Sequence, residues 1–327
     1  MSFSHDIADY PEGIVLSVDK PYRWTSADVI RKLKIAAFRH FRKKNLKVGH
    51  AGTLDPLATG VLLVCIGPAC KRAQTLQDHD KEYIAGIRFG ATTPSYDLEK
   101  DVNRRFPYQH ITAEAVQEAL KGFLGPQEQI APLFSAKSVD GVRAYEMARK
   151  LYRSGRSAEL DTAALETLHR SKIVISELEL LSFFPCNLAL TDKAFFSANN
   201  IADATKNALS ASEEYTENSF TDDNSAGGDA LSEASAIFLA KESAFPSANK
   251  NASSRINVAD TSALGLPEAV IRITCSKGTY IRAFARDLGE ALGSGAHLCS
   301  LVRSRSGDYR IEDALSLEQA LDLLKEG

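Results

Sequence analysis

One stretch of this sequence holds the residue types of a reactive site. It runs from Gly49 to Leu62 and reads GHAGTLDPLATGVL. Asp55 is its only acidic residue, and a carboxylate is suited to covalent attack or to proton abstraction. Glycines on both sides would let the backbone of a ligand approach closely, and His50 is near enough in sequence to share a pocket. An isolated Asp-Pro pair more often only accepts hydrogen bonds from nearby amides, so the surrounding sequence has to decide between the two interpretations.

A local excess of positive charge precedes this stretch. The window from Val29 to Leu54 contains no acidic residue, although the whole chain has a net charge of −3. Its basic residues are Arg31, Lys32, Lys34, Arg39, Arg42, Lys43, Lys44 and Lys47. A charge run is often only a solvated helix face, but this one adjoins a candidate reactive loop. The run is therefore either a solvated face or a surface for nucleic-acid phosphates, which would give affinity without sequence readout, and its place beside the loop favours the second interpretation.

Buried elements on both sides must hold the Asp55 loop in place. The apolar residues from Gly13 to Val18 predict a strand, and a helix capped by Thr25 or Ser26 follows it. The region from Gly49 to Gly60 is expected to be a loop, and the apolar run from Val61 to Ile66 predicts a second strand. A polar loop between two buried strands is a suitable place for a reactive side chain.

The remaining pattern predicts an α+β fold around a largely antiparallel sheet, because the strands do not alternate regularly with helices. A helix is expected from Thr112 to the Gly125-Pro126 pair, and another from Tyr280 to Leu292. The segment from Ser135 to Arg149 is expected to begin as a loop. Further strands are predicted at 83–89, 172–184 and 269–275, and a final helix at 317–325.

Composition sets residues 190–262 apart as an insertion, and leaves residues 1–189 and 263–327 as one domain that contains the Asp55 loop. The insertion is rich in Ala, Ser, Asn, Asp and Glu, so it has too little apolar surface to offset its ordering entropy, and we expect it to be flexible. The five cysteines are widely spread, and no His/Cys cluster has metal-ligand spacing, so we expect reduced thiols and no metal site. With no signal peptide or membrane span evident, a cytoplasmic protein is predicted.

The stretch around Asp55 resembles the G-H-x-G-T-L-D-P-x-A-T-G-V-L signature of the TruB family of tRNA pseudouridine synthases. The resemblance continues through segments on both sides and covers residues 13–189 and 267–310. The matching segments are Val18 to Pro21, Asp80 to Tyr83, Ser135-Ala136, Gly141 to Tyr145, Ala148-Arg149, Gly278 to Arg282, and Gly295 to Leu298 with Leu301 and Arg303. Many members of the family have a C-terminal PUA domain, which this chain is expected to lack because little sequence follows Tyr309.

The resemblance implies a pseudouridine synthase fold and the isomerisation of uridine 55 in the T loop of tRNA. It also implies Asp55 as the nucleophile, Arg282 as its partner and Tyr83 as a surface that stacks on the base. The implied substrate contacts are His50, Tyr280, Leu301 and Lys20. The only partner it implies is the T arm of tRNA, with no cofactor, no membrane and no obligate protein partner, and we expect a monomer.

Each implied role has a physical reason. A guanidinium can hold a carboxylate ionised through two parallel hydrogen bonds, which a lysine cannot do with the same planarity. An enzyme that acts on an unstacked base needs a replacement π surface, which a tyrosine supplies. We expect His50 to hold the RNA or the loop rather than to transfer a proton.

Two other functions remain open from the sequence. A tRNA-binding chaperone would use the same basic residues, and Asp55 would then be structural. A glycosidase or nucleosidase normally needs two carboxylates beside the scissile bond, and the motif contains only one.

Overall fold

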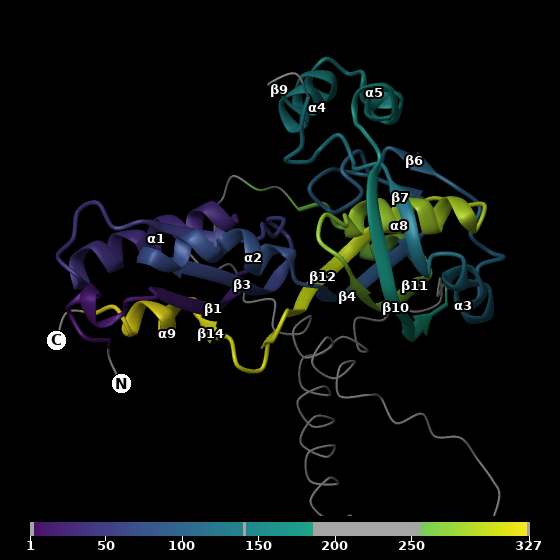
Figure 1. Ribbon diagram of the computed structural model, residues 1–327. Helices are drawn as coiled ribbons and strands as arrows, with labels where there is room; N and C mark the ends of the chain where they lie inside the picture. The colour runs from purple at the N-terminus through teal and green to yellow at the C-terminus, as the bar shows by residue number, and fades with distance from the viewer. Residues whose placement is uncertain (1–2, 140–141, 186–255, 257, 326–327) are drawn as a thin grey trace, which may run out of the picture. The chain divides into compact units, whose positions relative to one another are not determined.

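The computed structural model describes residues 3–139, 142–185, 256 and 258–325 (Figure 1). The predicted insertion at 190–262 therefore lies outside the described residues except for 256 and 258–262. Among the described residues, no helix combines the length and the apolar composition needed to cross a membrane.

Ten strands of the described chain form one mixed sheet in the order β14-β1-β3-β12-β4-β11-β10-β7, with β2 paired to β3 and β13 paired to β12. The pairs β1 with β14 and β3 with β12 are parallel, and the other pairs are antiparallel. The strands are β1 Ile14–Lys20, β2 Val48–Ala51, β3 Thr59–Ile66, β4 Lys81–Phe89, β7 Gly125–Gln129, β10 Ser171–Phe184, β11 Glu268–Cys275, β12 Ala296–Ser306, β13 Tyr309–Arg310 and β14 Leu315–Ser316. The expected α+β class with a largely antiparallel sheet is confirmed.

The helices pack on this sheet or beside it. They are α1 Ser26–His40, α2 Ala73–Asp78, α3 Ala113–Lys121, α4 Ala144–Arg153, α5 Leu160–Thr167, α8 Ile281–Ala291 and α9 Leu317–Asp322. Short 3-10 helices and two small two-stranded ladders complete the described chain: η1 Ile7–Asp9, η2 Gly67–Arg72, η3 Ser157–Glu159, η4 Ser262–Leu264, β5 Ala91–Thr92 with β6 Arg104–Arg105, and β8 Ser138–Val139 with β9 Val142–Arg143.

Helices cover both faces of β3, whose side chains alternate between two apolar clusters. Leu62, Val64 and Ile66 face the main core, which also contains the inner residues of α1 and α9. Val61, Leu63 and Cys65 face a smaller cluster with side chains of η2 and α2. Both faces of this strand are therefore buried, which explains its continuous apolar sequence.

Helix α1 forms as its sequence predicts. Thr25 is the N-cap, and it forms a capping box with Asp28, in which each side chain bonds the backbone N–H of the other residue. Val29, Leu33 and Ala37 are fully buried on one side of the helix. The basic side chains therefore occupy its exposed side.

Around β4, β11 and β12 the core is closed by α3 and α8. Phe284 and Leu288 of α8 are buried against apolar residues of these strands, and Val116 and Leu120 of α3 belong to the same cluster. Figure 1 shows α8 running across the sheet in this region. Arg282 lies in the first turn of α8, so the packing of this helix fixes its position.

Residues between β7 and β10 form a second, separate apolar cluster. It contains Phe134, Ala148, Leu160 and Ala164 among its buried residues, and Tyr280 packs against it. Figure 1 shows its helices α4 and α5 at one end of β10. We refer to residues 130–168 as the α4–α5 segment.

Two local expectations from the sequence are wrong, and one strand of the sheet is absent from them. The expected loop from Gly49 to Gly60 is shorter, because β2 takes up its beginning and β3 starts at Thr59. Helix α3 ends at Lys121, and Gly125-Pro126 opens β7, where a proline is tolerated because β7 is an edge strand. Strand β12 was not predicted, because polar and basic residues interrupt its apolar pattern.

Candidate active site

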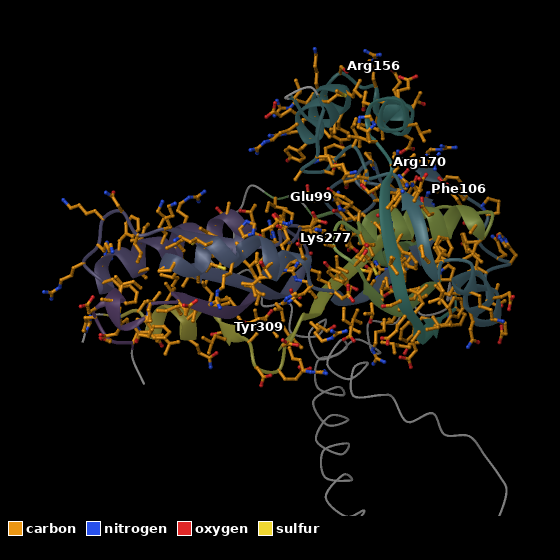
Figure 2. The ribbon with its side chains drawn as sticks, in the orientation of Figure 1. Glu99, Phe106, Arg156, Arg170, Lys277 and Tyr309 are labelled. Atoms are coloured by element: carbon orange, nitrogen blue, oxygen red, sulfur yellow. The ribbon has the colours of Figure 1, made fainter. Side chains whose placement is uncertain are left out.

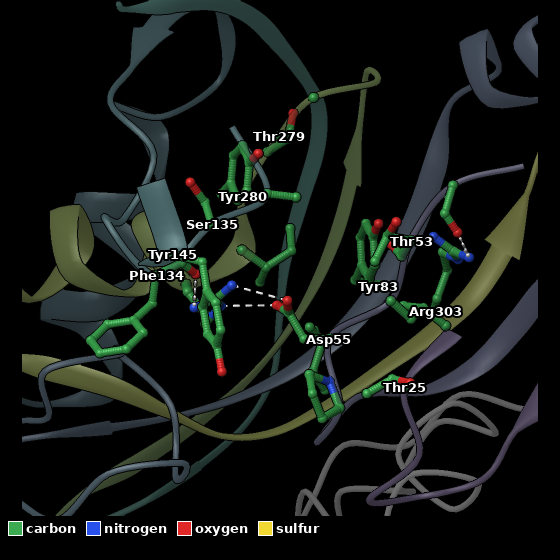
Figure 3. Close-up of a pocket in the computed structure, with 18 of the residues that line it drawn as sticks. Thr25, Thr53, Asp55, Tyr83, Phe134, Ser135, Tyr145, Thr279, Tyr280 and Arg303 are labelled. Atoms are coloured by element: carbon green, nitrogen blue, oxygen red, sulfur yellow. Dashed lines mark hydrogen bonds and ion pairs between the residues drawn. The ribbon is translucent and has the colours of Figure 1, made fainter. Parts of the chain in front are cut away.

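Asp55 lies at the wall of a cavity of about 630 Å³ (Figure 3), a size suited to a small molecule or a nucleotide. Segments far apart in the sequence supply its wall. Its residues are Thr25, 52–56, Gln77, Lys81, Tyr83, Glu99, Lys100, 134–136, Arg143, Tyr145, Arg149, Ile256, 276–282, Leu301 and Arg303. Asp55, Tyr83, Tyr280, Arg282 and Leu301 thus line one cavity, although 227 residues separate Asp55 from its partner Arg282.

The Asp55 loop is held from the β1–α1 side by hydrogen bonds to its backbone. The Ser26 hydroxyl lies 2.9 Å from the amide nitrogen of Leu54 and 3.2 Å from its carbonyl oxygen. The carbonyl oxygen of Pro56 accepts from the amide of Arg23 at 3.0 Å and from Lys20 Nζ at 3.2 Å. The residues on both sides of Asp55 are therefore fixed.

Lys20 has a different place from the expected substrate contact. Its side chain is fully buried, and Nζ also donates to the carbonyl oxygens of Pro21 at 2.9 Å and Trp24 at 2.6 Å. Burial lowers its pKa to about 7, although Asp55 and Asp19 act in the opposite direction. We correct the expectation: Lys20 ties the β1–α1 loop to the Asp55 loop, and its amine is not accessible to a substrate.

Arg303 holds the other side of the same loop, although its pattern in the sequence predicts no role for it. Only 1% of the residue is exposed. Its guanidinium donates to the carbonyl oxygens of Val61 at 2.7 Å, Gly52 at 3.2 Å and Thr53 at 3.5 Å. A charged side chain thus satisfies carbonyls that a tight loop would otherwise leave unpaired.

Arg282 holds the carboxylate of Asp55 through two hydrogen bonds. Nε donates to Oδ2 and Nη2 donates to Oδ1, both at 2.9 Å, as the dashed lines in Figure 3 show. Nη1 donates to the carbonyl oxygens of Phe134 at 2.9 Å and Ser95 at 3.2 Å. The side chain of Arg282 is 7% exposed and that of Asp55 is 36% exposed, so the arginine is enclosed while the carboxylate still reaches the cavity.

Two further carboxyl groups lie beside this pair. Asp97 is buried, with Oδ2 at 3.6 Å from Arg282 Nε and Oδ1 accepting from Ser95 Oγ at 2.6 Å. Burial raises the pKa of Asp97, although Arg282 lowers it. Burial raises the pKa of Glu99 to about 7, and the negative charge of Asp97 adds to this effect. Neither residue lies in a motif that singles it out, and only the fold brings them to Asp55.

Tyr83, Tyr280 and Leu301 belong to the apolar part of the wall. Tyr83 lies on β4 opposite Arg303 of β12 and is 9% exposed, and burial raises its pKa, so its hydroxyl is neutral at neutral pH. Leu301 is equally buried. Tyr280 is held by Gln129, whose side-chain amide accepts from its backbone N–H at 2.8 Å and donates to its carbonyl at 3.2 Å.

His50 and the predicted basic residues do not line the cavity. His50 lies on β2 opposite Val64, and burial, followed by the charge of Arg303, lowers its pKa. The eight basic residues of α1 and the following loop are all exposed. The cavity has other basic residues, for which no role was expected: Lys81, Lys100, Arg143, Arg149 and Lys277. Lys277 and Glu99 are both labelled in Figure 2.

No group of three or more His, Cys, Asp or Glu side chains could hold a metal ion in the part of the chain that the structure describes.

Known proteins match this chain in sequence and in fold. A model of the N-terminal domain of TruB family pseudouridylate synthases matches residues 39–184, and a model of the tRNA pseudouridylate synthase B C-terminal domain matches residues 282–326. The tRNA pseudouridine synthase B of Phocaeicola vulgatus is 41% identical over 310 residues, covering 95% of this chain and 92% of that protein. The protein of the same name from Deinococcus radiodurans is 33% identical over 305 residues, covering 93% of this chain and 77% of that protein.

Among solved structures, a chain of a Cbf5–Nop10–Gar1 complex matches 97% of this chain with a TM-score of 0.51 and 19% identity, and this chain spans 56% of it. The expected pseudouridine synthase fold is confirmed. Together, these matches define an enzyme of the pseudouridine synthase class, an isomerase. Within that class, the chain belongs to the TruB family.

Proposed function

We propose that this enzyme converts uridine 55 in the T loop of tRNA to pseudouridine, with Asp55 as the nucleophile. The observation that carries the proposal is the carboxylate of Asp55, held by Arg282 at the wall of a cavity of nucleotide size. The names of the relatives, which are tRNA pseudouridine synthases, support tRNA as the substrate.

The isomerisation exchanges one bond between ribose and base for another. The bond between ribose C1′ and N1 of the base breaks, a bond between C1′ and C5 forms, C5 loses a proton and N1 gains one. Atoms and electrons therefore balance without an oxidant, a metal or an organic cofactor. Asp55 acts as the nucleophile: the bond that it forms to C1′ replaces the bond between C1′ and N1, and it breaks in turn when the bond between C1′ and C5 forms.

Arg282 fixes the orientation of the Asp55 carboxylate. Each carboxylate oxygen can accept more than one hydrogen bond, so the two bonds from the guanidinium leave lone pairs free for the attack. Enclosure of the guanidinium strengthens the pair, because little water competes with it.

The apolar wall would receive the base after it leaves the RNA stack. Tyr83 supplies the stacking surface, and Tyr280 and Leu301 contact the nucleotide from their places in the cavity wall. His50 lies outside this wall, so we assign it to holding the loop rather than to chemistry.

Basic residues would hold the RNA backbone at two places. Four basic residues of the cavity, Lys100, Arg143, Arg149 and Lys277, bind phosphates close to the target nucleotide. Lys81 is buried, and its amine donates to the carbonyl oxygens of Gln77 and His79. The exposed group Arg31, Lys32, Lys34, Arg39, Arg42, Lys43, Lys44 and Lys47 binds phosphates further away. We further propose that the enzyme acts as a monomer in the cytoplasm and needs no protein partner.

An unmodified tRNA transcript tests the proposal. The wild type should convert uridine 55, as mapped by chemical labelling of pseudouridine, while Asp55→Asn should bind the tRNA with similar affinity and form no product. Asp322→Asn, which changes an exposed aspartate of α9, is the matched control and should remain active. Modification by Asp55→Asn at the wild-type rate would exclude the nucleophile role. If both proteins remodel tRNA without forming pseudouridine, the chaperone alternative holds.

A further inference from the structure

The turn Ser95-Tyr96-Asp97 contacts Arg282 through both of its outer residues. The carbonyl oxygen of Ser95 accepts from Nη1 at 3.2 Å, and Oδ2 of Asp97 lies 3.6 Å from Nε. The position of this turn therefore influences the orientation of the guanidinium that holds Asp55.

Tyr96, the middle residue of the turn, has a backbone conformation that is unusual for its type. Its φ is +58°, in the left-handed region that glycine and asparagine normally occupy. A bulky residue in this region needs compensating contacts to remain there. The side chain of Tyr96 supplies them, since the residue is only 6% exposed.

The hydroxyl of Tyr96 reaches the α4–α5 segment. It donates to Oδ1 of Asp161 on α5 at 2.8 Å, and burial raises its pKa so that it remains a donor. The guanidinium of Arg286 lies 5.7 Å from the centre of the tyrosine ring and donates to the carbonyl oxygen of Ile130 at 2.9 Å. The turn and the start of the α4–α5 segment are thus held by neighbouring side chains.

Two sets of contacts connect α5 to Arg282, one through Tyr96 and one through Phe134. Asp161 and Leu160 are neighbours on α5, and Leu160 shares the second apolar cluster with Phe134. The carbonyl oxygen of Phe134 accepts from Arg282 Nη1, and Arg282 contacts the turn that carries Tyr96. A displacement of the α4–α5 segment therefore acts on Arg282 from two sides.

We propose that Tyr96 is a positioning residue for the Asp55–Arg282 pair, and that its hydrogen bond to Asp161 couples the α4–α5 segment to the orientation of the nucleophile. The inference rests on the proposed function, because it concerns the same site. Asp161 is exposed and does not line the cavity, and its hydrogen bond to Tyr96 is the direct contact through which it would act on the pair.

Three variants test the coupling by single-turnover kinetics on the tRNA transcript. Tyr96→Phe and Asp161→Ala should each lower the rate constant about fivefold, with the Kd for tRNA within twofold of the wild type, since small displacements of reacting groups reduce rates strongly. Asp161→Asn should keep the wild-type rate, because its amide oxygen can still accept from the hydroxyl. The double variant Tyr96→Phe/Asp161→Ala should be no slower than either single variant.

Matched controls separate this effect from a general loss of structure. Glu166→Ala removes another exposed carboxylate from α5, and Tyr10→Phe removes a hydroxyl that accepts from the backbone of Ser4, far from the cavity in sequence. Both should keep the wild-type rate. If Tyr96→Phe does not fold, the comparison of Asp161→Ala with Asp161→Asn still tests the coupling. Asp161 is exposed, so both variants are expected to fold.

The proposal is overturned if Asp161→Ala slows the reaction less than twofold, if Asp161→Asn is as slow as Asp161→Ala, or if the loss lies in the Kd. Failure of the proposed function would look different: the wild type itself would form no pseudouridine in tRNA.

Discussion

Asp97 shares a guanidinium with Asp55. Its Oδ2 lies 3.6 Å from Arg282 Nε, the same nitrogen that donates to Asp55 at 2.9 Å. One buried positive charge therefore serves two carboxylates, and both approach the same nitrogen of the planar group. Since the two carbonyls of Ser95 and Phe134 occupy Nη1, nearly every donor of the guanidinium has a defined partner.

This arrangement predicts that Arg282→Lys lowers the turnover rate about a hundredfold, because an ammonium cannot make the parallel pair of bonds to Asp55 and also reach the two carbonyls. Affinity for tRNA should change little, since Arg282 is enclosed. Arg272→Lys, which changes an arginine paired with Glu179 at the surface of β11, is the control. A turnover rate within fivefold of the wild type would show that the planar geometry is unimportant.

Gly60 and Gly49, in the same motif, should respond oppositely to alanine. A Cβ on Gly60 would lie 2.2 Å from the carbonyl oxygen of Arg303, and its φ is +99°, so Gly60→Ala should destabilise the fold by about 3 kcal/mol. No described atom beyond its chain neighbours lies within 4 Å of a Cβ on Gly49, so Gly49→Ala should leave stability unchanged or slightly raised. Urea unfolding of the two variants measures the difference, and equal stabilities would contradict the packing argument.

The sequence predicted those helices and strands that depend on residues only a few positions apart. Helix α1 and strand β3 follow from apolar spacing and from a capping residue, which act within a few positions of the chain. The motif around Asp55 and the resemblance of the Tyr280 region were enough to name residues that lie at one cavity.

The rest of the site depends on contacts between distant segments. Asp97 and Glu99 are ordinary acidic residues in a turn until the fold brings them to Arg282, and Arg303 lies on a strand with no clear apolar pattern. Lys20 illustrates the opposite error. Its motif suggested a substrate contact, but its amine donates hydrogen bonds to three backbone carbonyl oxygens. The spacing of residues in the sequence does not reveal these bonds.

Glu99 should make tRNA affinity depend on pH near neutrality. Its pKa of about 7 means that the carboxyl group is mostly neutral at pH 6 and mostly charged at pH 8. The charged form adds repulsion between the cavity and RNA phosphates, so the Kd should rise about threefold more over this range for the wild type than for Glu99→Gln. Lys20, with a pKa of about 7, titrates in both proteins and cancels in the comparison.

Fluorescence titration of labelled tRNA at several pH values measures this difference. Glu312→Gln, which removes an exposed carboxylate near the end of the chain, should behave like the wild type. If Glu99→Gln shows the same rise in Kd as the wild type, ionisation of Glu99 does not influence RNA binding.

His297 should make the fold sensitive to acid. It is fully buried, with Nδ1 at 3.0 Å from the carbonyl oxygen of Ala91 and Nε2 at 3.2 Å from the hydroxyl of Thr261, and burial lowers its pKa to about 4. The unfolded chain takes up a proton at this position near pH 6.5, whereas the folded protein does not. The free energy of unfolding therefore decreases by up to about 3 kcal/mol as pH falls from about 6.5 to about 4. Urea unfolding should show a smaller loss in this range for His297→Asn, while His169→Asn, at an exposed site, should follow the wild type. Parallel curves for the wild type and His297→Asn would mean that other groups cause the acid sensitivity.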